Sequence, residues 1–126
     1  MKEKVKYFKC PVCGNIIEMI NGDIKKIKCC NKELELLVAN TIDASLEKHV
    51  PSYEIDKDEI IVKIGEIIHP MEEKHYIMWI SLVTDNKIIK VFLNPGDEPI
   101  VRLPYIKGSI IYEYCNLHGL WKNIVE

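Results

Sequence analysis

The sequence lacks the marks of several protein classes. No stretch approaches the roughly 20 apolar residues of a membrane span, and the basic N-terminus MKEKVKYFKC has no apolar run like that of a signal peptide. It contains no low-complexity tract and no internal repeat. The formal net charge of −2 gives no general case for binding nucleic acid or an anionic membrane. We therefore expect a globular protein of the cytoplasm in which any anion-binding patch is local.

Cysteine, in contrast, is well represented, with five residues in a chain of 126. In a reducing cytoplasm, cysteines are metal ligands or redox groups sooner than disulfides. Four of them form a Cys-Pro-Val-Cys segment and an adjacent pair, and they are Cys10, Cys13, Cys29 and Cys30. Four thiolates fill a tetrahedral site for zinc or iron, and the adjacent pair predicts a distorted tetrahedron. Spacing alone leaves structural zinc, mononuclear iron and a disulfide or redox dithiol open.

The sequence pattern divides the chain into two parts. Up to residue 37 it has short β-like segments and an Asn21-Gly22 hairpin signal. A module of this size cannot build a sufficient core, so a metal is expected to supply its stability. Residues 38–47, VANTIDASLE, are small and polar and indicate a linker with a helical turn. We expect a first domain at 1–37 and a second at 48–126.

The second domain carries apolar, β-branched runs at short spacing, separated by turn residues. These runs are 59–65, 75–83, 87–93, 100–106 and 109–115. None shows a convincing helical stripe, and several short strands at this spacing indicate an antiparallel sandwich. We therefore expect an all-β protein. Its aromatic residues Trp79, Trp121, Tyr76 and Tyr112 are interpreted as packing, and Glu72 and Glu73 as a solvated turn.

All four histidines lie in the second domain, each beside a predicted strand end or turn, and they are His49, His69, His75 and His118. Loops at one end of a sandwich can bring such positions together. The fifth cysteine, Cys115, stands three residues before the last histidine, and this pairing favours a metal site. Each of the other histidines, taken alone, is more often an ordinary residue than a ligand.

In their order along the chain, these motifs resemble the two-iron desulfoferrodoxins, superoxide reductases with an N-terminal desulforedoxin-like module. The matching segments are CPVCGNIIE from Cys10, the pair at 29–30, EKHVP at 47–51, HPMEEKHYI at 69–77 and YCNLHGLW at 114–121. They span nearly the whole chain, and every ligand position of the family pattern is filled.

The resemblance implies two mononuclear irons. A rubredoxin-like iron would be held by the four early cysteines, with zinc as a substitute there. A second iron would be bound in an immunoglobulin-like domain by the nitrogens of the four histidines, with Cys115 as the axial thiolate. The activity implied is reduction of superoxide to hydrogen peroxide, with electrons from a small carrier such as rubredoxin. Family members are usually homodimers.

Two residues beside the first histidine gain a role through the same resemblance. Lys48 is the candidate positive charge that steers superoxide and polarises a water for protonation. Glu47 matches the carboxylate that closes the ferric site after turnover. Without the resemblance, both are ordinary solvated side chains.

Two rival functions stay open beside this one. In a pure electron carrier, the four-cysteine iron would exchange electrons and the histidine domain would serve only as a docking platform. Superoxide would then not be consumed. A structural zinc protein would be colourless and without redox activity. The set of four histidines and one cysteine argues against both, since neither needs an open five-ligand site.

Overall fold

The computed structural model describes residues 5–22, 27–41, 46–65 and 69–126, without the side chains of residues 46 and 47. The chain divides into two compact units, Lys2–Val38 and Ala39–Glu126. In the described part, α1 (Leu46–His49) is the single helix, and all longer elements are strands. No helix of the described residues is long and apolar enough to cross a bilayer. The prediction of an all-β protein is confirmed.

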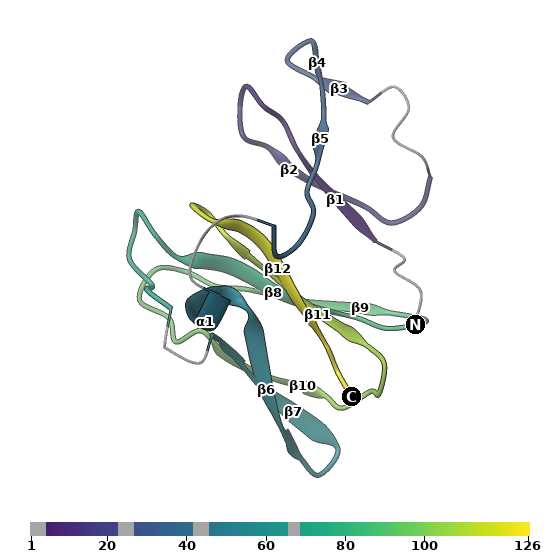
Figure 1. Ribbon diagram of the computed structural model, residues 1–126, viewed down its shortest axis with the longest axis vertical. Coiled ribbons are helices and arrows are strands. Elements are labelled where there is room, and N and C mark those ends of the chain that lie inside the picture. Colours follow the sequence, from purple (N-terminus) through teal and green to yellow (C-terminus); the bar gives the residue numbers. More distant parts are fainter. Residues whose placement is uncertain (1–4, 23–26, 42–45, 66–68) are drawn as a thin grey trace. The chain divides into compact units, whose positions relative to one another are not determined.

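The described part of the first unit contains five short strands (Figure 1). They are β1 (Lys6–Lys9), β2 (Ile16–Met19), β3 (Lys28–Cys29), β4 (Lys32–Glu33) and β5 (Glu35–Leu36). β1 lies between β2 and β5 in one antiparallel sheet, and β3 pairs with β4 in a second. Its small buried cluster consists of Phe8, Cys10 and Leu34. One of these three is a candidate metal ligand, so the core of this unit and its candidate metal site share a residue.

The turn between β3 and β4 explains how two adjacent cysteines can face one ion. Cys29 ends β3 and pairs with Lys32, which leaves Cys30 and Asn31 as a two-residue hairpin loop. Both loop residues have positive φ, 53° and 60°. Such a loop needs the left-handed conformation at both positions, as in a type I′ turn. In a strand, successive side chains would point to opposite faces, but the left-handed turn removes Cys30 from that alternation.

In its described residues, the second unit holds seven antiparallel strands in two sheets. They are β6 (Pro51–Asp56), β7 (Glu59–Ile64), β8 (Ile77–Val83), β9 (Ile88–Phe92), β10 (Ile100–Pro104), β11 (Ile110–Cys115) and β12 (Gly119–Ile124). One sheet has the order β10-β7-β6 and the other β12-β11-β8-β9. All five predicted runs of this unit form strands, and β6 and β12 are additional strands that the sequence pattern did not indicate.

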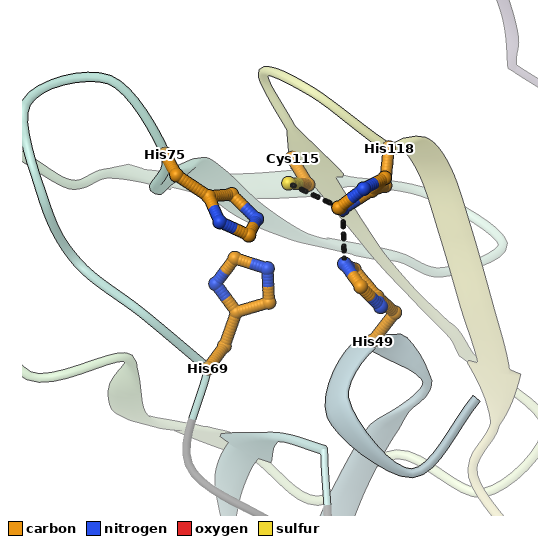
Figure 2. A group of neighbouring side chains, drawn as sticks. All are labelled: His49, His69, His75, Cys115 and His118. Carbon is orange, nitrogen blue, oxygen red and sulfur yellow. Dashed lines mark hydrogen bonds between the residues drawn. The ribbon is translucent and has the colours of Figure 1, made fainter. Parts of the chain in front are cut away.

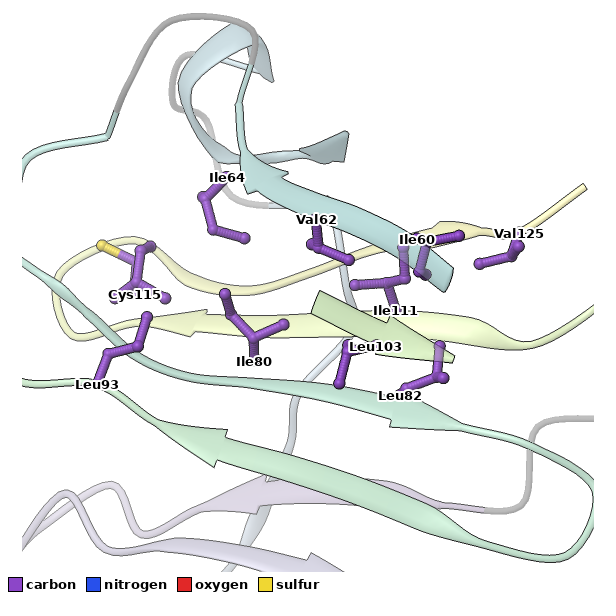
Figure 3. Packing of buried hydrophobic residues seen from close by; sticks show 11 residues of the cluster. Ile60, Val62, Ile64, Ile80, Leu82, Leu93, Leu103, Ile111, Cys115 and Val125 are labelled. Carbon is purple, nitrogen blue, oxygen red and sulfur yellow. The ribbon is translucent and has the colours of Figure 1, made fainter. Parts of the chain in front are cut away.

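The core of the second unit lies between its two sheets (Figure 3). β7 shows the alternation of a half-buried strand, with Ile60, Val62 and Ile64 buried. Side chains from β8 and β11 meet them, among them Ile80 and Ile111. Fully burying one such side chain is worth about 1.5–3 kcal/mol. The cluster of eleven buried residues therefore gives this unit a core that does not depend on a bound ion.

A β-bulge sets the position of Cys115 at the end of β11. Tyr114 pairs with Trp79, but the next residue, Cys115, pairs with Ile77, so Met78 is passed over. Bulges shift the alternation of side chains and re-aim them near functional sites. As a result, Cys115 remains in the buried cluster while the strand ends beside the turn that leads to β12.

Candidate metal centres

The four early cysteines lie on turns of the first unit. Cys10 follows β1, and the backbone folds back at once, because Gly14 N–H donates to Cys10 O at 3.1 Å. Gly14 has a φ of 77°, which glycine adopts without strain. Cys13 lies inside this turn. Cys10 is buried, whereas Cys13 and Cys30 are exposed.

The sulfur atoms are spaced as tetrahedral coordination of one metal ion requires. Cys13 Sγ lies 3.5 Å from Cys29 Sγ, and Cys29 Sγ lies 3.9 Å from Cys30 Sγ. A metal with bonds of about 2.3 Å to sulfur places tetrahedral sulfurs about 3.8 Å apart. All four sulfurs lie within 4.8 Å of one another. The donor set fits one ion, and a tetrahedron of this size suits iron and zinc alike.

Backbone and side-chain donors surround these thiols. The N–H groups of Cys13 and Val12 point at Cys10 Sγ from 3.5 and 3.4 Å, and they lower the pKa of Cys10 to about 6. The neighbouring thiols Cys13 and Cys10 raise the pKa of Cys29. Asn15 donates its amide N–H to Cys29 Sγ at 3.8 Å. The metal-free cluster thus begins from one easily formed thiolate, and an ion must displace the remaining protons.

The second group of donors gathers at one end of the sandwich. Three segments supply it: His49 ends α1, His69 and His75 precede β8, and Cys115 and His118 flank the turn between β11 and β12. Figure 2 shows the four rings and the sulfur converging on one point. Their five donor atoms lie within 4.8 Å of one another. The structure therefore brings together every histidine of the chain and the fifth cysteine.

The four imidazoles occupy the corners of a square. His49 and His69, and likewise His69 and His75, have ring centroids 4.7 Å apart and planes 76° and 80° apart. His118 closes the square at 5.0 Å from His75 and 4.7 Å from His49. The diagonal from His49 to His75 is 6.4 Å, close to the value of about 6.7 Å for a square with such sides. Those two rings are nearly parallel, at 27°.

Atom distances agree with a square rather than a tetrahedron. His49 Nε2 lies 2.9 Å from His118 Nδ1. Metal–nitrogen bonds of about 2.1 Å place neighbouring donors about 3.0 Å apart in a square and about 3.4 Å apart in a tetrahedron. Cys115 Sγ lies 3.9 Å from the same His118 nitrogen. Four nitrogens in a square with one sulfur suit a metal that accepts more than four ligands, which a closed structural zinc site does not.

Hydrogen bonding fixes which nitrogen of His69 faces the centre. His69 Nδ1 lies 2.7 Å from the carbonyl oxygen of Pro70, which can only accept, so Nδ1 carries the proton. Its Nε2 is therefore a free lone pair, and it is buried with no hydrogen-bond partner in the described residues. This is the arrangement in which a histidine is oriented as a metal ligand. His75 Nε2 is buried and unpartnered in the same way.

Burial keeps these rings neutral. Removal from water lowers the pKa of His69 to about 4, although the bond to Pro70 opposes the effect. Burial also lowers the pKa of His75, followed by the charges of His118 and Lys48, while Glu72 opposes them. Since only neutral imidazole can bind a metal, the site is ready for an ion at neutral pH.

The two predicted accessory residues differ in what can be said of them. Lys48 is exposed in α1 directly before His49, and its charge reaches the ring of His75. The backbone of Glu47 belongs to α1, but its side chain is outside the described residues. The roles expected for both residues stay predictions.

Two further residues support the donors: Trp121, which was expected only to pack, and Asn116, which was not singled out from the sequence. Trp121 is fully buried, stacks on His49 at 4.9 Å between centroids, and donates its indole N–H to the carbonyl of His118 at 3.1 Å. The packing role expected for Trp121 is therefore packing against the site itself. Asn116, beside Cys115, bonds to the segment that carries His75. Their positions inside the matched segment YCNLHGLW were the available signal.

One buried acid shares the core face with the sulfur. Glu113 lies two residues before Cys115 on β11, is fully buried, and has no hydrogen-bond partner for either oxygen in the described residues. Burial raises its pKa well above the ordinary range. Burial raises the pKa of Cys115 as well, with a contribution from the field of Glu113.

Fold and donors together define a class. The chain is an all-β protein with two candidate mononuclear metal centres, one of four thiols and one of four imidazoles and a thiol. A family model described as "Desulfoferrodoxin, N-terminal domain" matches residues 2–37, and one described as "Desulfoferrodoxin" matches residues 41–124. The chain belongs to the desulfoferrodoxin family.

Individual relatives agree with this assignment. A desulfoferrodoxin of Syntrophotalea carbinolica is 49% identical over 124 residues, covering 98% of each chain. The crystal structure of the superoxide reductase from Treponema pallidum matches with a TM-score of 0.75 and 29% identity, covering 96% of this chain and 99% of that one. A one-iron superoxide reductase from Giardia intestinalis matches with a TM-score of 0.54 and 33% identity, covering 64% of this chain and 98% of that one.

Proposed function

We propose that this protein is a superoxide reductase, in which a ferrous ion is held by His49, His69, His75, His118 and Cys115. The observation that carries the proposal is the square of four imidazoles with one sulfur, at distances that fit a single ion. The net reaction joins one superoxide, one electron and two protons to give one hydrogen peroxide. When bound, iron supplies that single electron and, with five protein donors, keeps one coordination position for a small anion.

The charge of the donor set favours an anionic substrate. Four neutral imidazoles and one thiolate leave a divalent ion with a net charge of about +1, because only the sulfur is negative. Burial of His69 keeps its ring neutral through the whole physiological range. The donors therefore hold the ion without cancelling the positive field that attracts superoxide.

Lys48 extends that field to the surface. Its ammonium group is exposed, next in sequence to His49, and near enough to influence His75. A positive charge at the mouth of a site raises the encounter rate of an anion and can polarise a water that donates a proton. For Glu47, we propose the family role of closing the ferric site after turnover. Its place in α1, one residue before Lys48, supports this.

The four-cysteine centre is proposed to hold a second, rubredoxin-like iron, for which zinc can substitute. The one-iron enzyme from Giardia intestinalis is covered at 98% by only 64% of this chain, which supports assigning superoxide chemistry to the histidine centre alone. The four-cysteine iron then relays electrons or staples its module. A small carrier such as rubredoxin is proposed as the electron donor.

The remaining expectations join this proposal. We keep the domain limits of 1–37 and 48–126 with a linker at 38–47. Seven antiparallel strands in sheets of three and four support the immunoglobulin-like assignment of the second domain. Five free cysteines grouped as metal donors support a reducing cytoplasm. A homodimer is expected, and sedimentation of the purified protein tests it.

The decisive experiment counts products. Anaerobically reduced, iron-loaded protein is mixed with a known pulse of superoxide, and the peroxide and oxygen formed are measured. We expect one peroxide per superoxide and no oxygen. Half a peroxide with half an oxygen would mean dismutation instead. Superoxide that decays no faster than in buffer would favour a pure electron carrier.

A further inference from the structure

Asn116 forms a clamp around a candidate ligand, His75, that lies 41 residues away in the chain. It directly follows Cys115, and its half-buried side chain bonds to the backbone on both sides of His75. Tyr76 N–H donates to Asn116 Oδ1 at 2.9 Å, and Asn116 Nδ2 donates to Lys74 O at 3.0 Å. The backbone N–H of Asn116 donates to Tyr76 O at 3.2 Å as a third bond.

His75 is the ring that most needs such support. Within the described part of the chain, no residue makes a hydrogen bond to its imidazole, and its Nε2 is buried without a partner. The ring of His69 is instead fixed by the Pro70 carbonyl, and that of His49 packs on Trp121. The place of His75 is thus decided through its backbone.

That backbone is held from two sides. On one side, Glu72 and His75 exchange two bonds, Glu72 N–H to His75 O at 2.9 Å and His75 N–H to Glu72 O at 3.0 Å. On the other side is the clamp of Asn116. Without the clamp, the Glu72–His75 turn would keep its own shape but would lose its tie to the segment that carries Cys115.

We propose that Asn116 is a positioning residue that sets His75 relative to Cys115, so that this imidazole and the thiol are held as one unit. The inference rests on the proposed function, since it takes both residues as ligands of one iron. It goes beyond that function by naming an outer residue that controls the geometry of the centre. Partners of this kind typically change metal affinity or activity by about 10- to 100-fold when they are replaced.

The chain offers a matched control. Asn40 makes the same two-bond clamp on a different backbone, donating from Nδ2 to Lys122 O at 3.1 Å and accepting from Lys122 N–H at 2.9 Å. Asn40 is exposed, and both of these side-chain bonds are to Lys122, which lies beyond the last donor, His118. The variant Asn40→Ala removes an equal set of hydrogen bonds and, because Asn40 has a φ of 63°, also strains the backbone. It therefore tests general destabilisation without changing a residue between two donors of the histidine centre.

The experiment measures iron release from each centre of the same molecule. The iron-loaded protein is mixed with excess chelator, and the visible bands of the two centres are followed separately. For Asn116→Ala we expect release from the histidine centre about 10-fold faster than in the parent. Release from the four-cysteine centre should not change. Asn116→Asp keeps the acceptor for Tyr76 N–H. Its rate of iron release from the histidine centre should therefore lie between the rates of the parent and of Asn116→Ala, and its visible band should be closer to that of the parent.

Two results would overturn the inference. One is release from the histidine centre of Asn116→Ala within about twofold of the parent, with an unchanged visible band and reduction potential. The other is equal acceleration in Asn40→Ala, which would mean general destabilisation. If Asn116→Ala does not fold, a parent-like rate and band in Asn116→Asp together overturn it. A parent protein that binds iron only at its cysteines would instead refute the proposed function.

Discussion

The two candidate centres stand in opposite relations to the fold around them. In the described part of the first unit, the buried cluster has three members, Phe8, Cys10 and Leu34, and one of the three is a candidate ligand. In the second unit, a cluster of eleven buried residues lies between two sheets; Cys115 is the single candidate ligand among them, and the other donors gather at its end. The comparison teaches that a metal in the first unit holds the fold, whereas the fold of the second unit holds the metal.

The centres also differ in charge. Four thiolates make a divalent ion net negative by about two, while four imidazoles and one thiolate leave it positive by about one. The surroundings of each centre favour these charges. Backbone N–H donors lower the pKa of Cys10 and so favour its negative thiolate, whereas burial lowers the pKa of His69 and so favours its neutral ring. An anionic substrate is therefore attracted to the second centre only.

Removing one ligand from each centre should give the largest contrast. For Cys29→Ser we expect the first unit to lose its ordered structure, because metal binding in small modules supplies on the order of 10 kcal/mol. For His75→Ala we expect a folded sandwich with superoxide consumption lowered by roughly 100-fold. Hydrogen exchange resolved by segment measures the folding of both variants, and an assay with a pulse of superoxide measures its consumption. Protection of residues 5–22 in Cys29→Ser at the parent level would refute the comparison.

The same cysteine variant separates two roles of the first iron. Superoxide turnover by Cys29→Ser is measured with a chemical reductant and with the electron-carrier protein as donor. If the first iron only stabilises its module, the variant should be less stable but should turn over superoxide like the parent with both donors. A relay predicts normal turnover with the chemical reductant and a loss with the carrier.

Lys48 gives an effect of intermediate size. Lys48→Ala should slow the reaction with superoxide by about 3- to 10-fold and weaken its dependence on ionic strength, because a steering charge is removed. Lys63→Ala makes the same charge change at an exposed position on β7 and serves as the control. Pulse radiolysis at several salt concentrations measures both variants. Equal rates and equal salt slopes for the two would dismiss the steering role.

Glu113 gives the smallest effect and tests the core of the second unit. Its pKa is raised by burial, so between the unfolded pKa near 4.5 and the folded value the native state holds one extra proton. Stability of the parent should therefore fall as pH rises through that window, by up to about 1.4 kcal/mol per pH unit. Glu113→Gln has no such proton, so its stability relative to the parent should increase with pH.

Urea unfolding of both proteins from pH 5 to pH 8 measures the difference. Both proteins are measured without metal, so that the pH dependence of metal binding does not enter the comparison. A difference that is constant with pH would mean that the buried carboxyl finds a partner in solution.

Pattern reasoning predicted the three inner strands and two of the four edge strands, β9 and β10, and it missed β6 and β12. The runs that became β7, β8 and β11 are apolar because those strands have neighbours on both sides and bury most of their side chains. β6 and β12 lie at sheet edges. β6 is exposed along its second half, so its sequence PSYEID carries charges that hide the alternation.

The same limit applies to the candidate sites. Spacing alone indicated the four-cysteine site and favoured the pair Cys115 and His118. The other three histidines were predicted as donors only through the family resemblance, because a single histidine is more often an ordinary residue. Asn116 could not be predicted, since its partners Lys74 and Tyr76 become neighbours only when β11 pairs with β8. The left-handed turn at Cys30 likewise depends on the register of β3 with β4.

The spacing of donors along the chain also sets an order of assembly. Cys10 and Cys29 are 19 residues apart, whereas His49 and His118 are 69 residues apart. During synthesis the ribosome delivers the whole cysteine set early, and the short loop between its members costs little entropy to close. The histidine set is complete only after β11 and the turn that follows it have been made. An ion in the second centre is therefore a sign that the sandwich has already closed, whereas an ion in the first can help a nascent chain begin to fold.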